Sequence, residues 1–435
     1  MRIILLTIIY INSSIASYSE DLYISGFNSV LNFNEYKDPI VQEYVQDLSK
    51  KLTKNTNLQN KIIKTNVPSE YNKINAFTIF NKFIVIYPEL IRVLNSESQL
   101  SAIIAHELSH IFYNHYYTTV QEISGSRIKG IGSIIASIAA GIASNNTDVF
   151  MGTFYTSLSA IKSSDLKNSR TKEEQADLKA IDLLQNIGAG PSDLIEAFNI
   201  LDHYAPKNIG HSANIIPEEY NSTHPHLSTR IKLISKYKKK KHNKHDQLSF
   251  NLIQARLGKK DFKGKIEVKY VEALNYIKGD KYNSAERILI SLPYNKNWII
   301  LATLIECWEK QKKFSNIINI DNNKSYESDT VKLYQAKAYI NKGEYLKARR
   351  NSGLNIFKIN NNFETNYRWF ELAAQLAGAV TNDDYFMYFM GLYNFNKGNF
   401  KTSKLQFEKA KSSNLLSPEQ LKDLVHNLKV IKEFI

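Results

Sequence analysis

The sequence predicts a mainly α-helical protein, with an N-terminal α+β domain that holds a small sheet and a following domain of paired helices. Three observations support this fold class: short apolar strands near residues 75–86, a helical apolar pattern over residues 100–112, and weak repeats over residues 248–430. A chain of 435 residues is long enough for two or more domains. The predicted segments are a leader at 1–16, the α+β domain at 17–235, a basic linker at 236–247 and the helical domain at 248–435.

The α+β domain is expected to start with a helix over residues 36–58, followed by two short strands and a second helix. Ser96 and Glu97 can cap this second helix, in which Leu100, Ile103, Ile104, Leu108, Ile111 and Phe112 keep helical spacing. Residues 128–143 are apolar and rich in small side chains. As a helix they would reach about 24 Å, short of the ~30 Å hydrocarbon core. They therefore form either a close-packed core helix or a segment that lies on lipid or on a partner protein.

Residues 106–110 read His-Glu-Leu-Ser-His, an H-E-x-x-H motif inside the apolar helix. Because a helix turns about 100° per residue, His106 and His110 lie on one face and can bind the same zinc ion. Glu107 can then serve as general base toward water. The alternative is a pair of partly buried histidines without a metal. His115 lies about 140° around the helix from His110, so we expect it to be structural.

A catalytic zinc needs three protein ligands and one open position. The next candidate segment is residues 169–177, which open an amphipathic helix that runs to about Gln185. Glu173 and Asp177 share a face of that helix at i, i+4 spacing. One carboxylate can bind the metal while the other orients a ligand histidine. A solvated acidic first turn, which favours the helix dipole, explains the pattern equally well.

The two motifs together resemble the M48 peptidase family, and the whole chain looks like the periplasmic branch of that family that carries tetratricopeptide repeats. The resemblance implies one zinc ion per chain. Its implied ligands are His106, His110 and Glu173, with Glu107 as catalytic base and Asp177 supporting the ligands. The family stretch S-R-x-x-E-x-E-A-D has a second Glu that is Gln175 here, which we expect to matter little because this position is not a ligand.

Two further segments of the domain match this family. Asn75, Ala76 and Phe77 precede the apolar strand at 83–86, and the resemblance implies that they edge the cleft and hold an extended substrate by strand addition. The family's Pro-Gly-Gly is replaced by Phe-Asn-Lys at 80–82, so the rim of the cleft is expected to differ. Ala-Gly-Pro at 189–191 follows the Glu173 helix, as a helix stop should.

Thr223-His224-Pro225, with Arg230 six residues beyond the histidine, matches the H-P…R element of the family. The resemblance implies that His224 approaches the zinc and that Arg230 lines the site. We treat His224 as a possible fourth ligand that keeps the site shut until substrate displaces it. A histidine in a surface loop is the alternative.

The first residues have the pattern of a secretory signal peptide. A basic Met1-Arg2 precedes an apolar stretch at 3–11, and Ser14-Ile15-Ala16 offers small residues for cleavage before Ser17. A hydrophobic start of a mature domain is the alternative. Export implies an oxidising compartment, yet the single cysteine, Cys307, excludes an internal disulfide. Cys307 lies in an apolar helical stretch and is expected to be buried packing.

The formal charge of +14 comes mostly from dispersed lysine, but residues 236–245 form one dense basic run. Such a run is a solvated linker, a contact with an anionic membrane surface or a contact with nucleic acid. We favour the linker because the run separates the two domains. An exported protein rarely meets nucleic acid, so peripheral membrane contact is the main rival and nucleic acid is not an expected partner.

The helical domain carries a repeated pattern in one frame, at 280–285, 312–317, 343–348 and 398–403. An aromatic residue stands two positions after a turn residue, and a small or aliphatic residue follows three positions later. The aromatics are 32, 31 and 55 residues apart, so the array is irregular or an extra helix pair intervenes near 365–389. The pattern fits the tetratricopeptide helix-turn-helix, and an unrelated helical bundle is the alternative.

These features lead to three functional hypotheses. The first is a zinc endopeptidase of the periplasm, which the resemblance directs at unfolded or stalled exported proteins such as outer-membrane β-barrel precursors. In that case the repeats would bind substrate, or the outer-membrane assembly machinery. The second is a repeat-based periplasmic chaperone or scaffold with a latent zinc site. The third is a membrane-surface protein anchored by residues 128–143 and the basic run.

Overall fold

The computed structural model describes residues 24–29, 31–32, 35–69, 73–124, 166–204, 224, 227–237, 246–320, 328–352, 367–379 and 383–434. The chain divides into two compact units: the larger comprises 36–113 and 168–354, and the smaller comprises 1–35, 114–167 and 355–435. The fold is mainly α-helical with one small sheet, as predicted. The predicted leader, the apolar segment 128–143 and most of the basic run lie outside the described residues.

The sheet belongs to the larger unit and has three described strands, where the sequence predicted two. They are β1 (Lys64–Asn66), β2 (Ala76–Ile79) and β3 (Phe83–Ile86), in the order β1-β3-β2. β1 runs parallel to β3, and β2 runs antiparallel to it. All four side chains of β3 are buried, as expected for the central strand. β2 is therefore an edge strand.

A tight turn joins β2 to β3 where the family has Pro-Gly-Gly. Phe80 and Asn81 both have positive φ angles, of 53° and 50°, and the amide of Lys82 donates to the carbonyl of Ile79 at 3.2 Å. Two positive φ angles are typical of the hairpin turn that matches strand twist. Asn tolerates this conformation, whereas Phe80 adopts it at a steric cost while its ring is buried.

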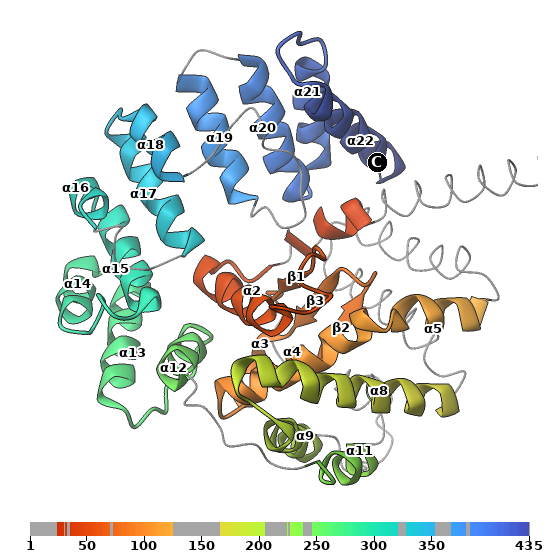
Figure 1. Cartoon of the computed structure of the whole chain (residues 1–435). Helices are drawn as coiled ribbons and strands as arrows, with labels where there is room; N and C mark the ends of the chain where they lie inside the picture. The colour runs from red at the N-terminus through yellow and green to blue at the C-terminus, as the bar shows by residue number, and fades with distance from the viewer. Residues whose placement is uncertain are drawn as a thin grey trace, which may run out of the picture. The chain divides into compact units, whose positions relative to one another are not determined.

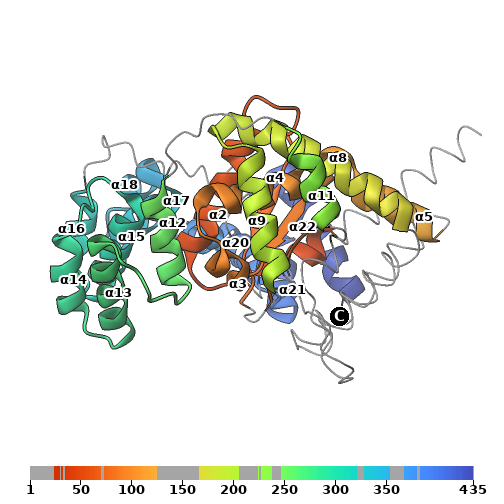
Figure 2. The same ribbon diagram turned by 90° about the horizontal axis from the view of Figure 1, so that it is seen from below.

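Helices of the larger unit surround the sheet. They are α2 (Pro39–Thr53), α3 (Pro88–Val93), α4 (Glu97–Phe112), most of α8 (Leu166–Leu184), α9 (Pro191–Tyr204) and α11 (Leu227–Ile234), with a 3-10 turn η1 (Gln185–Ile187) after α8. The Ser96 hydroxyl accepts from the amide of Gln99 at 3.3 Å, which confirms the predicted cap of α4. α9 lies against both α4 and α11 (Figure 2). Gly188, with a φ of 75°, ends the turn after α8.

The larger unit also contains helices from the predicted helical domain (Figure 1). They are α12 (Gln247–Arg256), α13 (Lys265–Lys278), α14 (Tyr282–Ile290), α15 (Trp298–Lys310), α16 (Phe314–Ile318), α17 (Asp329–Asn341) and α18 (Tyr345–Ser352). Glu43 of α2 caps α17, because its carboxylate accepts from the amides of Asp329 at 2.7 Å and Thr330 at 2.9 Å. Gln254 of α12 donates to the carbonyls of Ile91 at 2.9 Å and Leu94 at 2.7 Å. The predicted domain boundaries stay a prediction.

The smaller unit contains N-terminal residues, of which 24–29 and 31–32 are helical, together with helices from the C-terminal part of the chain. Its other described helices are α5 (His115–Ser124), α19 (Arg368–Ala379), α20 (Asp383–Asn396), α21 (Phe400–Ala410) and α22 (Pro418–Phe434). Asn28 and Asn32 both donate to the side-chain oxygen of Asn396, at 3.2 and 3.1 Å. Between α18 and α20 the described residues form one helix, α19. No helix of the described residues has both the length and the apolar character needed to cross a membrane.

Four helix pairs share the repeated frame that the sequence predicts: α13–α14, α15–α16, α17–α18 and α20–α21. Each begins its second helix at the predicted aromatic residue, and the turn residue two positions earlier has a left-handed backbone. Those turn residues are Asp280, Lys312, Gly343 and Gly398, with φ angles of 57°, 56°, 75° and 73°. The residues three positions beyond the aromatics, Ala285, Ile317, Ala348 and Ser403, are fully buried. The frame thus places one left-handed turn residue and one buried packing residue in every pair.

We expect Lys312→Gly to raise the free energy of unfolding by about 0.5–1 kcal/mol. A side chain at positive φ costs about 1–2 kcal/mol, which exceeds the entropic cost of glycine in the unfolded chain. The matched change Gly343→Ala should lower it by about 1 kcal/mol, because it adds a Cβ at a φ of 75°. Urea unfolding of both variants measures the effect, and a less stable Lys312→Gly variant would contradict it.

Candidate metal centre and active site

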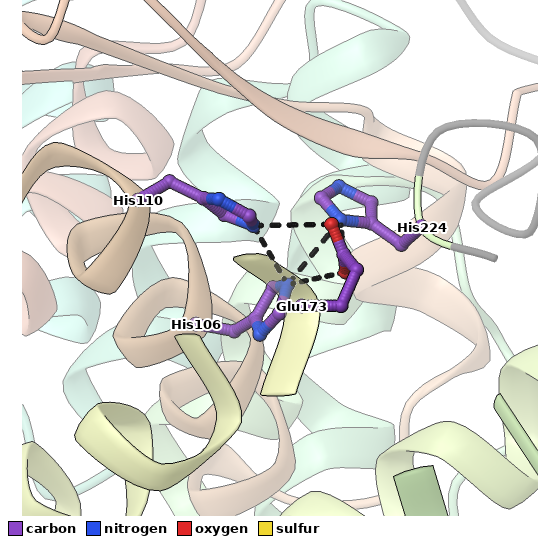
Figure 3. Close-up of side chains that lie close together, drawn as sticks. All are labelled: His106, His110, Glu173 and His224. Atoms are coloured by element: carbon purple, nitrogen blue, oxygen red, sulfur yellow. Dashed lines mark hydrogen bonds and ion pairs between the residues drawn. The ribbon is translucent and has the colours of Figure 1, made fainter. Parts of the chain in front are cut away.

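Helix α4 places both histidines of the H-E-x-x-H motif at one buried point. The Nε2 atoms of His106 and His110 lie 3.0 Å apart, and both side chains are shielded from solvent. Glu173 from α8 and His224 from the segment before α11 join them (Figure 3). Each of the four residues offers a ligand atom, and these atoms all lie within 4.8 Å of one another. Glu173 and His224, which follow His106 by 67 and 118 positions in the sequence, thus lie beside it in the fold.

The spacing of these atoms fits a small tetrahedral ion. His106 Nε2 lies 3.2 Å from His224 Nδ1 and 3.3 Å from Glu173 Oε2. Glu173 lies 3.1 Å from His224 Nδ1 and, through Oε1, 3.6 Å from His110 Nε2. Ligand atoms at 2.0–2.1 Å from zinc in a tetrahedron are about 3.3–3.4 Å apart. Imidazole nitrogen and carboxylate oxygen are also the ligand types that zinc accepts in catalytic sites.

Asp177 lies one helical turn after Glu173 and contacts the other side of His106. Its Oδ1 is 3.0 Å from His106 Nδ1, which leaves Nε2 of that ring turned toward Glu173. A carboxylate in this position holds the tautomer and orientation of a ligand histidine. Both Glu173 and Asp177 are buried. These residues of α8 therefore do not form the solvated acidic turn that was the alternative. Gln175, which departs from the family pattern, is exposed.

Arg230 of α11 forms ion pairs with the two buried carboxylates, Asp177 and Glu173. Its guanidinium donates to both oxygens of Asp177, at 2.7 and 2.6 Å, and its Nη1 lies 2.9 Å from Glu173 Oε2. It also lies over the ring of Phe198, 4.4 Å from the centroid. Burial alone would raise the pKa of Asp177, but the charge and hydrogen bonds of Arg230 lower the pKa below its usual range.

Glu107 is held by β2 and by His224. The hydroxyl of Thr78 donates to Glu107 Oε2 at 3.1 Å, and His224 Nε2 lies 3.2 Å from Oε1. The carboxylate is fully buried and next to the four converging atoms. Thr78 and Phe198 were not predicted from the sequence. Thr78 stands two residues after Ala76, so strand alternation places it on the same side of β2, which was the available signal.

The predicted substrate-binding residues lie at the start of edge strand β2. The carbonyl of Asn75 accepts from the amide of Tyr87 at 3.0 Å, so this carbonyl is hydrogen-bonded within the protein itself. The carbonyl of Ala76 lies 3.4 Å from His224 Nε2. Pairing alternates along an antiparallel strand, so the backbone groups of Ala76 and Thr78 point away from β3. Phe77 is buried.

His115 does not belong to this cluster. α4 ends at Phe112, and Asn114 has a φ of 62°, so His115 begins a separate helix, α5. Within the described part of the chain, the potential metal ligands that gather are His106, His110, Glu173 and His224. Cys307 is buried in α15, and burial raises the pKa of its thiol to about 12. Neither residue is needed to explain the site.

Two histidines one helical turn apart, a carboxylate from a second helix and a glutamate beside the first histidine define a metallopeptidase. This class of enzyme uses such ligands for the metal and such a glutamate as the base. Residues 39–238 match peptidase family M48, so the chain carries an M48 peptidase domain.

Curated relatives extend the similarity beyond this domain. The β-barrel assembly-enhancing protease of Escherichia coli (strain K12) is 24% identical over 382 residues, covering 80% of this chain and 74% of that protein. The protein of the same name from Yersinia pestis is 22% identical over 338 residues, covering 70% and 66%. The putative β-barrel assembly-enhancing protease of Vibrio cholerae is 23% identical over 195 residues, covering 44% and 40%. The chain is thus a homologue of these proteases.

Proposed function

We propose that this metallopeptidase is a zinc-dependent endopeptidase that cleaves unfolded or stalled exported proteins, including outer-membrane proteins. The observation that carries the catalytic part is the convergence of His106, His110 and Glu173 beside the buried carboxylate of Glu107. The class of substrate rests on the relatives, whose names state a role in β-barrel assembly.

The chain's own residues divide the catalytic work. His106, His110 and Glu173 would hold one zinc ion, which supplies Lewis-acid activation of water and of the scissile carbonyl when bound. Glu107 takes the proton from the attacking water and returns it to the leaving amine. Thr78 keeps one oxygen of Glu107 in place, and Asp177 keeps His106 turned toward the ligand position.

The outward backbone of β2 would hold the substrate. An extended peptide that pairs with this edge would bond the backbone groups of Ala76 and Thr78 that point away from β3, as in strand addition. Asn75 and Phe77, whose groups face the fold, would fix the strand rather than touch the peptide. The scissile bond would then lie close to Glu107, which Thr78 contacts directly.

We also propose that His224 holds the site closed at rest. Its Nδ1 fills a fourth ligand position, while its Nε2 contacts Glu107 and the carbonyl of Ala76. One ring therefore covers a metal position, the base and part of the substrate edge. A substrate strand entering along β2 would compete for the same carbonyl and displace it.

Removal of the metal tests the proposed activity. Dialysis against a strong chelator should abolish cleavage of an unfolded protein such as reduced casein, and one equivalent of Zn²⁺ should restore it. Metal analysis by mass spectrometry should find about one zinc ion per active chain. Cleavage that continues in a chain shown to be free of metal would contradict the proposal.

Replacing His224 with Ala should increase the rate of proteolysis severalfold, because it frees Glu107 and Ala76 while three ligands remain. Zinc content, measured in parallel, should stay near one ion per chain. An unchanged rate with zinc still bound would argue against the closed state. If the natural chain and the His224→Ala variant both bind unfolded protein without cleaving it, the alternative function is favoured, namely a chaperone or scaffold whose zinc site is latent.

The place of action and the partners follow from the sequence and the relatives. We infer export to the periplasm from the leader pattern at 1–16. The helix pairs provide a surface for substrates or for the outer-membrane assembly machinery, in line with the names of the relatives. Peripheral membrane contact through the basic run at 236–245 would appear as salt-sensitive sedimentation with anionic liposomes.

A further inference from the structure

A cavity of about 420 Å³ opens in the larger unit, apart from the catalytic site. It lies where the C-terminal end of α12, the second half of α13 and the residues before α2 meet (Figure 1 shows these helices). Its size falls within the range of sites that bind small ligands, about 300–1,000 Å³. None of its lining residues is assigned a role in the proposed peptidase reaction.

The cavity combines an apolar lining with an excess of positive charge. Its apolar side chains are Ala255, Leu257, Val271, Leu274 and Ile277. Four basic residues line it, Arg256, Lys259, Lys260 and Lys278, against one acidic residue, Asp38. The carboxylate of Asp38 is already used, because it pairs with Arg256 and accepts from the amides of Ile40 and Val41. The lysines therefore dominate the charge offered to a ligand.

Arg256 is a fixed part of the wall. It also donates to Glu306 at 2.9 Å and to Thr303 at 2.8 Å, and so has its charge satisfied within the fold. Lys259 differs: it is half-buried, and its ammonium donates to the side chain of Gln254 at 3.1 Å and to the carbonyl of Arg92 at 3.5 Å, both neutral acceptors. Burial lowers the pKa of Lys259, although the nearby Asp261 partly opposes this. A bound carboxylate would stabilise this ammonium.

We propose that this cavity binds the C-terminal residue of a polypeptide that ends in an apolar side chain. Such a residue carries a free carboxylate and an apolar group on the same carbon, which matches a cavity lined by both lysines and apolar residues. An internal acidic residue places its carboxylate on the side chain and has no apolar group to fill the lining. The inference relies on the proposed function only in that the chain meets unfolded polypeptides.

Binding at this cavity would recruit substrates rather than cleave them. A chain held by its end at a second site of the same unit reaches the catalytic site at an increased effective concentration. Proteins with an apolar C-terminal residue would then be cleaved faster than the same proteins with a blocked or acidic end. The effect should appear in KM and leave kcat for a short internal peptide unchanged.

The test uses the full chain with Glu107→Gln, so that the probe is not cleaved. Fluorescence anisotropy measures binding of a labelled neutral octapeptide that ends in Phe with a free carboxylate. The same peptide with a C-terminal amide should bind about tenfold more weakly or worse. Equal affinity for the acid and the amide, or no binding of the acid, would overturn the proposal. This comparison uses the same protein for both peptides and does not depend on proteolysis.

Variants locate the site. The triple change Lys259→Gln, Lys260→Gln and Lys278→Gln should weaken binding of the free acid about tenfold. A matched control removes three exposed lysines of and after α21, by Lys404→Gln, Lys409→Gln and Lys411→Gln, and should leave binding unchanged. An equal loss in both triple variants would show only nonspecific attraction and overturn the proposal. Stronger binding of decanoate than of the peptide would overturn it in favour of a lipid.

Failure of this inference and of the proposed function can be told apart. If the acid peptide binds but no zinc-dependent cleavage is found, the cavity proposal stands and the peptidase proposal fails. If cleavage of an amidated internal peptide is normal in the lysine variant, the catalytic site is intact there. Loss of binding in that variant then belongs to the cavity.

Discussion

Replacing Glu107 with Gln should lower the rate of peptide-bond hydrolysis by about 10²–10⁴-fold, the usual contribution of a positioned general base. Gln keeps the shape of the side chain and can still accept from Thr78, which contacts Glu107 at 3.1 Å. It cannot take a proton from water. The loss should therefore appear in kcat, whereas KM for a peptide substrate should change little.

The control for this variant is its metal content. Because His106, His110 and Glu173 are untouched, the Glu107→Gln chain should bind zinc as the natural chain does. Cleavage of an unfolded protein and bound zinc should be measured on the same preparation. A variant as active as the natural chain would remove Glu107 from the mechanism, whatever its metal content.

Replacing Arg230 with Ala should lower the free energy of unfolding of the metal-free chain by about 3–5 kcal/mol, the cost of leaving a buried charge without its partner. Arg230 is 1% exposed and contacts Asp177 and Glu173, both of which are buried. The matched surface change Arg92→Ala breaks a pair with Glu89 that is partly exposed, and should cost about 1 kcal/mol or less.

The loss in the Arg230→Ala variant should depend on pH. Arg230 lowers the pKa of Asp177 below its usual range, so the pair stabilises the fold above the ordinary carboxyl pKa of about 4. That contribution disappears as pH falls through the lowered pKa of the folded state. The difference in the free energy of unfolding between the variant and the natural chain, measured with urea in the presence of a chelator, should be largest near pH 7 and should decrease in acid. A pH-independent difference would argue against charge as its cause.

The sequence was most informative where chemistry and helical spacing coincide. His106 and His110 are on one face because α4 forms, and α4 forms because Ser96 caps an apolar stretch. The turn frame of the helix pairs was readable for the same reason, since each turn needs a left-handed residue before an aromatic. Both features depend on backbone geometry within a few residues, so a short stretch of sequence is enough to predict them.

Other features depend on packing between distant segments. Spacing alone could not tell whether Glu173 and Asp177 face solvent or a metal, because their burial depends on Arg230 from another helix. β1 was missed because Lys64-Thr65-Asn66 has no apolar residue, and its parallel pairing with β3 comes from the tertiary fold. The cavity beside α12 was likewise invisible, since three separate segments build it.

Because Glu43 caps α17, a truncated fragment that lacks Glu43 would also lack part of that cap. Its carboxylate accepts from the amides of Asp329 and Thr330 in the first turn of α17 and from the hydroxyl of Ser328 at 3.1 Å, while that hydroxyl accepts from the amide of Val331. A fragment that starts after the peptidase segment would lack these acceptors, and α17 would fray from its N-terminal end. The third helix pair is thus completed by a side chain nearly three hundred residues earlier, so isolated repeats would be a poor substitute for the intact chain in binding studies.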